Sequence, residues 1–161
     1  MVKKGVFMKY LALSLFIISM NIYPQSEHDI EKGKESLKAA DREFSELSKK
    51  KGMVEAFLSY ADNDAVLLRD YTMPIVGIKA VKTFISEGNN DFTLIWEPLF
   101  ADISSSLDMG YTYGTYFLTY LDGDNKEQEA KGTYLTIWKK DKSGNWKWVL
   151  DNGNQGLEPK K

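Results

Sequence analysis

The side chains of this sequence that could take part in chemistry are few, and they lie near aromatic residues. Arg69 follows the apolar run 65–68, and Asp151 follows Val149 and Leu150. An arginine beside aromatic rings can hold a carboxylate or an enol oxygen through several N–H groups. The candidate ligand-binding set adds five aromatic residues of the C-terminal half and comprises Arg69, Trp96, Tyr111, Tyr113, Tyr134, Trp138 and Asp151.

A structural role for the same residues is the alternative. Arg69 and Asp151 could form an ordinary ion pair or face water, since charge pairs within proteins are common. Each aromatic ring could simply fill the hydrophobic core, which is the commoner use of such residues. No residue is assigned a catalytic role on this basis, and whether the protein is an enzyme stays open.

Several kinds of site are excluded by composition. The 161 residues contain no cysteine and one histidine, His28. Thiol nucleophiles, disulfides, cysteine-ligated zinc, iron–sulfur clusters and sites with two histidine ligands are therefore impossible. The acidic stretches 62–64 and 122–125 lack the ligand spacing of an EF-hand and carry the residues that turns prefer. We expect no metal and no cofactor.

The N-terminal segment is typical of a secretory signal peptide. Lys3, Lys4 and Lys9 precede a mostly apolar run of 13 residues, Tyr10–Ile22, and a polar chain follows. This run is short for a membrane span, which needs about 20 apolar residues. We expect residues 1–25 to be removed and the protein to be exported, either to the periplasm or out of the cell, with no stable membrane anchor. An uncleaved interfacial anchor is the alternative.

The charge balance argues against a nucleic-acid partner. The whole chain has a net charge of −2, and loss of the three lysines of residues 1–25, which contain no acid, would leave −5. Binding to phosphates needs a basic face, so we expect no nucleic acid as partner.

Hydrophobic periodicity predicts helices in the first half of the chain and strands in the second. Helices are expected over residues 29–48, 53–60 and 78–87, the first with an apolar stripe at Leu37, Ala40, Phe44 and Leu47. Residues 61–64 are predicted as a turn, followed by a short β-rich run at 65–68. Long strands are expected over residues 92–103, 107–121, 129–140 and 146–151. Three helices followed by four antiparallel strands indicate the α+β class.

Several strands carry bulky apolar side chains on both faces. In residues 133–138, Tyr134 and Trp138 alternate with Leu135 and Ile137. A sheet with one solvated face would show a cleaner alternation of apolar and polar residues. We therefore expect helices on one face and a second subunit on the other, which predicts a homodimer through the outer sheet face. Gly110 and Gly114 indicate a bend or a close approach of backbones.

The order of these motifs resembles the nuclear transport factor 2-like superfamily, in its SnoaL-like and ketosteroid-isomerase-like branch. The resemblance covers residues 36–154 and rests on the segments 40–44, 56–67, 74–81, 110–116, 132–138 and 144–151. It implies a cone-shaped, cystatin-like α+β fold, with three N-terminal helices packed on a curved, mostly antiparallel sheet and a pocket between them. The expected domains are the signal peptide 1–25, the SnoaL-like domain 29–155 and a flexible tail 156–161.

The chemistry of the isomerase branch is not expected to carry over with the fold, unless a bulge shifts Asp70 into the position of the base. That branch uses a carboxylate base and an oxyanion hole of a tyrosine and a protonated aspartate. The base position falls on Arg69, with Asp70 next to it, the first-helix tyrosine near Phe44 or Ser45, and the second acid near Thr133 or Tyr134. The resulting hypothesis is a binding domain for a small hydrophobic molecule in an aromatic pocket. A cofactor-free isomerase, cyclase or hydratase and a dimeric interaction module without ligand are the alternatives.

Overall fold

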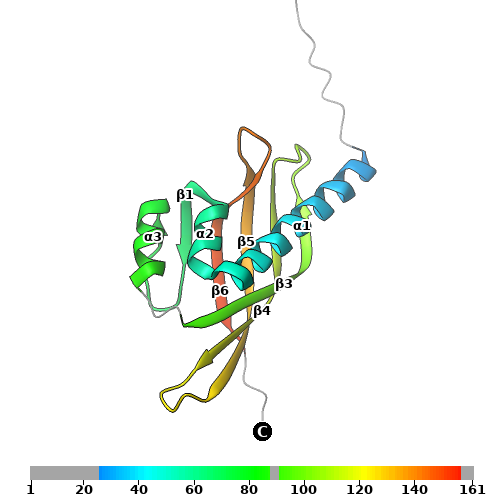
Figure 1. Ribbon diagram of the computed structural model, residues 1–161. Helices are drawn as coiled ribbons and strands as arrows, with labels where there is room; N and C mark the ends of the chain where they lie inside the picture. Colours follow the sequence, from blue (N-terminus) through cyan, green and yellow to red (C-terminus); the bar gives the residue numbers. More distant parts are fainter. Residues whose placement is uncertain (1–25, 88–90, 157–161) are drawn as a thin grey trace, which may run out of the picture.

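The computed structural model describes residues 26–87 and 91–156 and shows three helices and six strands within them. In chain order these are α1 (Glu27–Lys51), α2 (Met53–Tyr60), β1 (Ala61–Leu68), β2 (Ile75–Val76), α3 (Ile78–Glu87), β3 (Phe92–Ile103), β4 (Met109–Leu121), β5 (Glu127–Lys140) and β6 (Trp146–Gln155) (Figure 1). The expected signal segment 1–25 and the tail beyond Gly156 lie outside the described residues, so both stay predictions. No helix in the described ranges has both the length and the apolar character needed to cross a bilayer.

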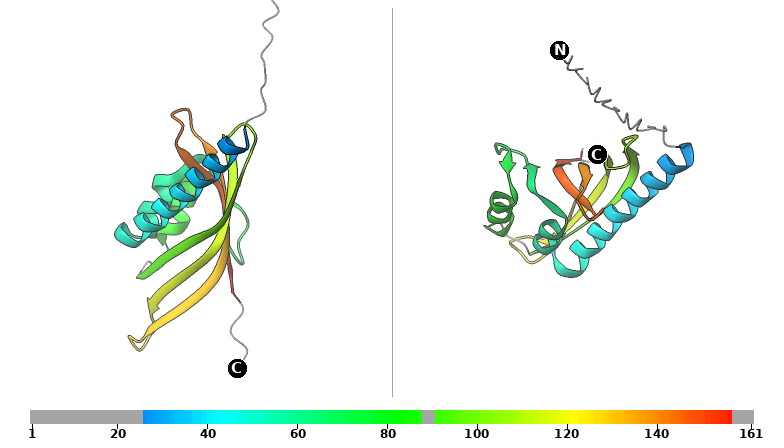
Figure 2. Two further views of the ribbon diagram at one scale, coloured as in Figure 1. Left: turned by 90° about the vertical axis from the view of Figure 1, so that its right-hand side faces the viewer. Right: turned by 90° about the horizontal axis from the view of Figure 1, so that it is seen from above.

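The strands form one twisted sheet in the order β2-β1-β6-β5-β4-β3. Strands β3 to β6 are antiparallel neighbours, as expected, whereas β1 runs parallel to β6. The expectation of three helices followed by four strands is therefore too simple, because α3 follows β1 and β2 in the chain. The helices α1 and α2 lie on the same side of the sheet (Figure 2). The α+β class and a mostly antiparallel sheet are confirmed.

The predicted turn at residues 61–64 is wrong. These residues belong to β1, where the pairing with β6 shifts between Ala61, opposite Trp148, and Val66, opposite Leu150. The backbone N–H of Asp64 donates to the Asp62 carboxylate at 2.9 Å, a local hydrogen bond of the kind that turns use. The local hydrogen bond typical of a turn is thus present, but the residues that make it form an irregularity within β1 and do not end the strand.

Helix α1 is held to the edge strand β3 by serines as well as by apolar packing. Ser26 caps its N-terminus and Gly52 its C-terminus, where the φ of 86° suits a glycine. The Ser45 hydroxyl accepts the backbone N–H of Trp96 at 2.8 Å, and the Ser48 hydroxyl donates to the carbonyl of Leu94 at 2.7 Å. Side chains of the helix thereby satisfy backbone groups at the sheet edge, which would otherwise need another partner.

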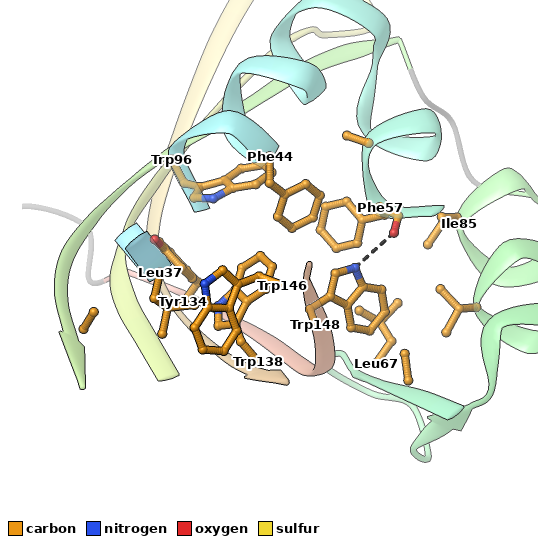
Figure 3. Packing of buried hydrophobic residues seen from close by; sticks show 14 of the residues in the cluster. Leu37, Phe44, Phe57, Leu67, Ile85, Trp96, Tyr134, Trp138, Trp146 and Trp148 are labelled. Atoms are coloured by element: carbon orange, nitrogen blue, oxygen red, sulfur yellow. Dashed lines mark hydrogen bonds between the residues drawn. The ribbon is translucent and has the colours of Figure 1, made fainter. Parts of the chain in front are cut away.

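Aromatic rings that pack against one another form a large part of the hydrophobic core (Figure 3). The ring of Phe44 lies at its centre, with its centroid 4.5–6.0 Å from those of Phe57, Tyr60, Trp96 and Trp138. All four tryptophan N–H groups have an acceptor; that of Trp148, for example, donates to the carbonyl of Phe57 at 3.0 Å. Buried tryptophans need such partners because an unpaired N–H is costly away from water.

A β-bulge bends β3 beside one of the two glycines that the sequence singled out. The pairing with β4 shifts between Pro98, opposite Gly114, and Phe100, opposite Tyr113. A Cβ atom at Gly114 would lie 2.0 Å from the carbonyl oxygen of Glu97. The expected close approach of backbones is therefore present, and only glycine fits there.

Candidate functional site

A half-open cavity of about 180 Å³ lies between α2 and the inner face of β3–β6. Its walls are mostly apolar, and its polar groups gather at one end. The lining residues are Met53, Phe57, Arg69, Phe92, Leu94, Trp96, Tyr116, Leu118, Tyr134, Thr136, Asp151 and Gly153. An apolar cavity with a few convergent polar groups is the usual form of a small-molecule site.

The polar end of the cavity is built on an ion pair. The Arg69 guanidinium donates to Asp151 Oδ1 at 2.8 Å and to the carbonyl of Leu68 at 2.7 Å. The Thr136 hydroxyl donates to the other oxygen of Asp151, also at 2.8 Å. Arg69 lies directly after β1 and Asp151 on β6, so the parallel pairing of these strands brings them together. Arg69 and Asp151 therefore form the ion pair that was expected from the sequence as an alternative, and both residues also line the cavity.

A second carboxylate, Asp41 of α1, lies fully buried behind two of the cavity's aromatic walls. Its oxygens accept hydrogen bonds from the Trp96 indole N–H and from the Tyr134 hydroxyl, each at 2.7 Å. The Thr112 hydroxyl also hydrogen-bonds to it. Asp41 thus fixes the positions of Trp96 and Tyr134, whose rings face the cavity.

The protonation of this buried group is set mainly by its removal from water. Burial raises the pKa of Asp41 to about 6, against the lowering effect of its hydrogen bonds, and the charge of Asp151 adds to the rise. Burial, followed by the charge and hydrogen bond of Asp41, raises the pKa of Tyr134 above its ordinary value. The phenol of Tyr134 therefore remains a hydrogen-bond donor at neutral pH.

Four of the seven candidate residues lie at the cavity, and three do not. Arg69, Trp96, Tyr134 and Asp151 line it. Two of the others, Tyr111 and Tyr113, lie on the outer face of β4, 37% and 43% exposed, because they alternate with the buried residues Gly110, Thr112 and Gly114.

Trp138 points inward but is also wrongly assigned to the pocket. It is 0% exposed, its ring packs in the core, and its N–H donates to Thr112 at 2.9 Å. The expected aromatic wall is therefore mostly a solid core, with a small cavity at one side. Whether the cavity residues bind a ligand stays a prediction.

The structure also brings to the site several residues that sequence reasoning missed, among them Asp41 and Tyr116. Asp41 lies four residues after Leu37 and three before Phe44, on the buried stripe of α1, so a carboxylate on an apolar stripe was the available signal. Tyr116 lies directly opposite Gly132 on β5. A Cβ atom on residue 132 would lie 2.4 Å from the nearest atom of the Tyr116 ring. Glycine at position 132 thus lets that ring lie close over β5 at the cavity.

The oxyanion-hole positions of the isomerase branch hold no matching groups here. Phe44 is in the core and Ser45 bonds to the backbone of β3. Within residues 26–87 and 91–156, no three His, Asp or Glu side chains gather closely enough to hold a metal ion.

Comparisons with known proteins show the fold. No protein-family model matches the sequence, and no curated protein matches it. A ketosteroid isomerase-like protein from Erwinia carotovora atroseptica superposes with a TM-score of 0.67 at 14% identity, covering 80% of this chain and 98% of that one. An NTF2-like protein with a cystatin-like fold from Novosphingobium aromaticivorans gives 0.60 at 12% identity, with coverages of 74% and 79%.

A third similar structure is an association domain. The association domain of CaMKII from C. elegans gives a TM-score of 0.58 at 16% identity, covering 78% of this chain and 97% of that chain. The chain is therefore a domain with the nuclear transport factor 2-like fold, as its motifs suggested. Because one fold carries many functions, the function has to be argued from the site.

Proposed function

We propose that this domain binds a small, largely apolar molecule in the cavity between α2 and the sheet. The observation that carries the proposal is the amphipathic form of the cavity, in which apolar walls end at the Arg69–Asp151 ion pair. A cavity of about 180 Å³ suits a molecule with roughly one ring, because an engineered apolar cavity of about 150 Å³ is known to bind benzene.

Binding is favoured over catalysis by the state of the two carboxylates. Each oxygen of Asp41 and of Asp151 already accepts a hydrogen bond from a protein group. These bonds favour a structural role for both residues over that of a general base, which needs to reach a proton of the substrate. A cofactor-free isomerase, cyclase or hydratase is therefore the second candidate.

A melting experiment with two matched variants tests the binding proposal. We expect at least one compound from a panel of small aromatic and alicyclic molecules to raise the melting temperature. Leu118→Trp fills the cavity and should abolish the shift, whereas Leu121→Trp, on the same strand at an exposed position, should retain it. The proposal fails if no compound stabilises the unchanged protein or if both variants keep the shift.

We also propose that the outer sheet face pairs with a second copy of the chain. Large apolar side chains lie exposed there, among them Phe100, Tyr111, Tyr113, Phe117 and Leu135, each 37–43% exposed. The Phe100 ring stacks on that of Tyr113 with centroids 5.3 Å apart, so the patch is continuous across strands. Such patches commonly mark interfaces, and the similarity to an association domain agrees with this role.

The oligomeric state in solution tests this interface. Light scattering coupled to size exclusion should give a dimer for the unchanged protein and a monomer for Leu135→Lys. Tyr71→Lys places the same charge on a fully exposed loop residue and should remain dimeric. A monomer at all micromolar concentrations in the unchanged protein would rule the interface out.

The third proposal is export to the periplasm or out of the cell, supported by the basic and apolar pattern of residues 3–22. Fractionation of a bacterial host and the intact mass of the purified protein test it. We expect the protein outside the cytoplasm with about 25 residues removed. A full-length mass in the cytoplasm would contradict the proposal.

A further inference from the structure

The polar end of the cavity offers several hydrogen-bond donors that no protein group among the described residues uses. A guanidinium has five N–H groups, and Arg69 uses one toward Asp151 and one toward Leu68. Three N–H groups of Arg69 have no protein acceptor among the described residues. The hydroxyl of Tyr116, at the same end, also has no hydrogen-bond partner in that part of the chain.

Each oxygen of the carboxylate at this end already accepts one hydrogen bond from the protein. Asp151 accepts a hydrogen bond from Arg69 on one oxygen and from Thr136 on the other. The Thr136 hydroxyl therefore has no proton left to donate to a ligand. A ligand group placed there would meet the free N–H groups of Arg69, which can only donate, and the Tyr116 hydroxyl, which can donate or accept. Since the Arg69 N–H groups can only donate, the ligand group that pairs with them is a hydrogen-bond acceptor.

The charge at this end selects among acceptors. The positive charge of Arg69 is balanced by Asp151 at 2.8 Å, and the Asp151 side chain is only 8% exposed. A further negative charge, the exposed Asp70, acts on Tyr116 and opposes the effect of Arg69 there. A carboxylate ligand would therefore approach two anions and one cation, which is unfavourable in a partly desolvated site.

The rest of the cavity carries no such polarity. Beyond Tyr116 its walls are Phe92, Leu94, Leu118 and the ring of Trp96, with Met53 and Phe57 above them from α2. These groups match an apolar ring but provide no partner for a second polar group at the far side.

We propose that the cavity takes a single-ring compound with one uncharged hydrogen-bond acceptor, such as a carbonyl oxygen, held by the free donors of Arg69 and Tyr116. This inference rests on the proposed binding function and adds the chemical class of the ligand. The acceptor lies at the ion pair, and the ring lies against β3 and β4.

Three probes of similar size test the inference by calorimetric titration: acetophenone with an uncharged carbonyl, benzoate with a charged carboxylate, and ethylbenzene without an acceptor. We expect acetophenone to bind about tenfold more tightly than either of the others, the value of one well-made hydrogen bond. Tyr116→Phe should reduce that preference several-fold while leaving the affinity for ethylbenzene nearly unchanged. Tyr120→Phe, on the same strand outside the cavity, is the matched control and should retain the preference.

The remaining outcomes separate this inference from the proposed function. Tightest binding of benzoate would overturn the uncharged class, and equal binding of acetophenone and ethylbenzene would show that no acceptor is recognised; in both cases the cavity would still be a binding site. An unchanged preference in Tyr116→Phe would overturn the role of that hydroxyl. Failure of all three probes would overturn the ligand class, while the wider melting panel with Leu118→Trp decides the proposed function independently.

Discussion

The two faces of β4 and β5 use similar residues for different purposes. On the inner face, Thr112, Tyr134 and Thr136 are buried, and each hydroxyl has a hydrogen-bond partner. On the outer face, Tyr111 and Tyr113 are more than one third exposed, and their hydroxyls have no such partner within the described residues.

The difference shows that aromatic content does not locate a pocket. Neighbouring residues of a strand point to opposite faces, so a shift by one position moves a tyrosine from a buried network to the surface. Burial then forces the inner polar groups to pair, because an unsatisfied polar group away from water costs roughly 1–3 kcal/mol. The outer groups are free of that requirement and remain available to a partner.

The largest expected effect comes from the carboxylate at the centre of the inner network. Asp41→Ala leaves the Trp96 indole N–H and the Tyr134 hydroxyl without acceptors and opens a small void, so the free energy of unfolding should fall by about 3 kcal/mol. Asp102→Ala removes a carboxylate that is 45% exposed and paired with Lys34, and should cost less than about 0.5 kcal/mol. Urea denaturation of both variants measures this contrast, and equal losses would contradict it.

A pH effect of intermediate size follows from the raised pKa of Asp41. Its folded-state value of about 6 lies above the ordinary value of 3.8, so the folded protein binds more protons between these values. Stability should therefore fall as pH rises through this window, by about 2 kcal/mol between pH 4 and pH 6 for this group.

The variant Asp41→Asn isolates that contribution, since it cannot titrate. Urea denaturation at pH 4, 5 and 6 should show a difference between the unchanged protein and the variant that shrinks as pH rises. A difference independent of pH would mean that Asp41 has the same pKa in the folded and unfolded chains.

The smallest effects come from removing one hydroxyl on each face. Tyr134→Phe removes the donor to Asp41 and should lower the free energy of unfolding by about 1–2 kcal/mol. Tyr113→Phe makes the same chemical change on the outer face and should cost no more than about 0.3 kcal/mol. Thermal or urea denaturation gives both values, and a larger loss for Tyr113→Phe would reverse the comparison of the two faces.

Much of the secondary structure could be read from local patterns. The bounds of α2, α3 and β3 agree with those predicted, because apolar periodicity and the turn residues between the segments act over short distances. The stretch 61–64 was misread since its turn residues form an irregularity within β1, and only the pairing of β1 with β6 shows this. Assignment of Tyr111 and Tyr113 to the pocket failed because the sequence does not say which of two apolar faces the helices cover.

The sequence by itself determined the α+β class, the aromatic composition of the sheet and the absence of cysteine chemistry, because these depend on residue types and short-range spacing. The tertiary structure decided that Arg69 meets Asp151 across 82 positions of the chain and that Asp41 holds Trp96 and Tyr134. These contacts arise from strand pairing and from the seating of α1 on the sheet, and local preferences do not encode either of them.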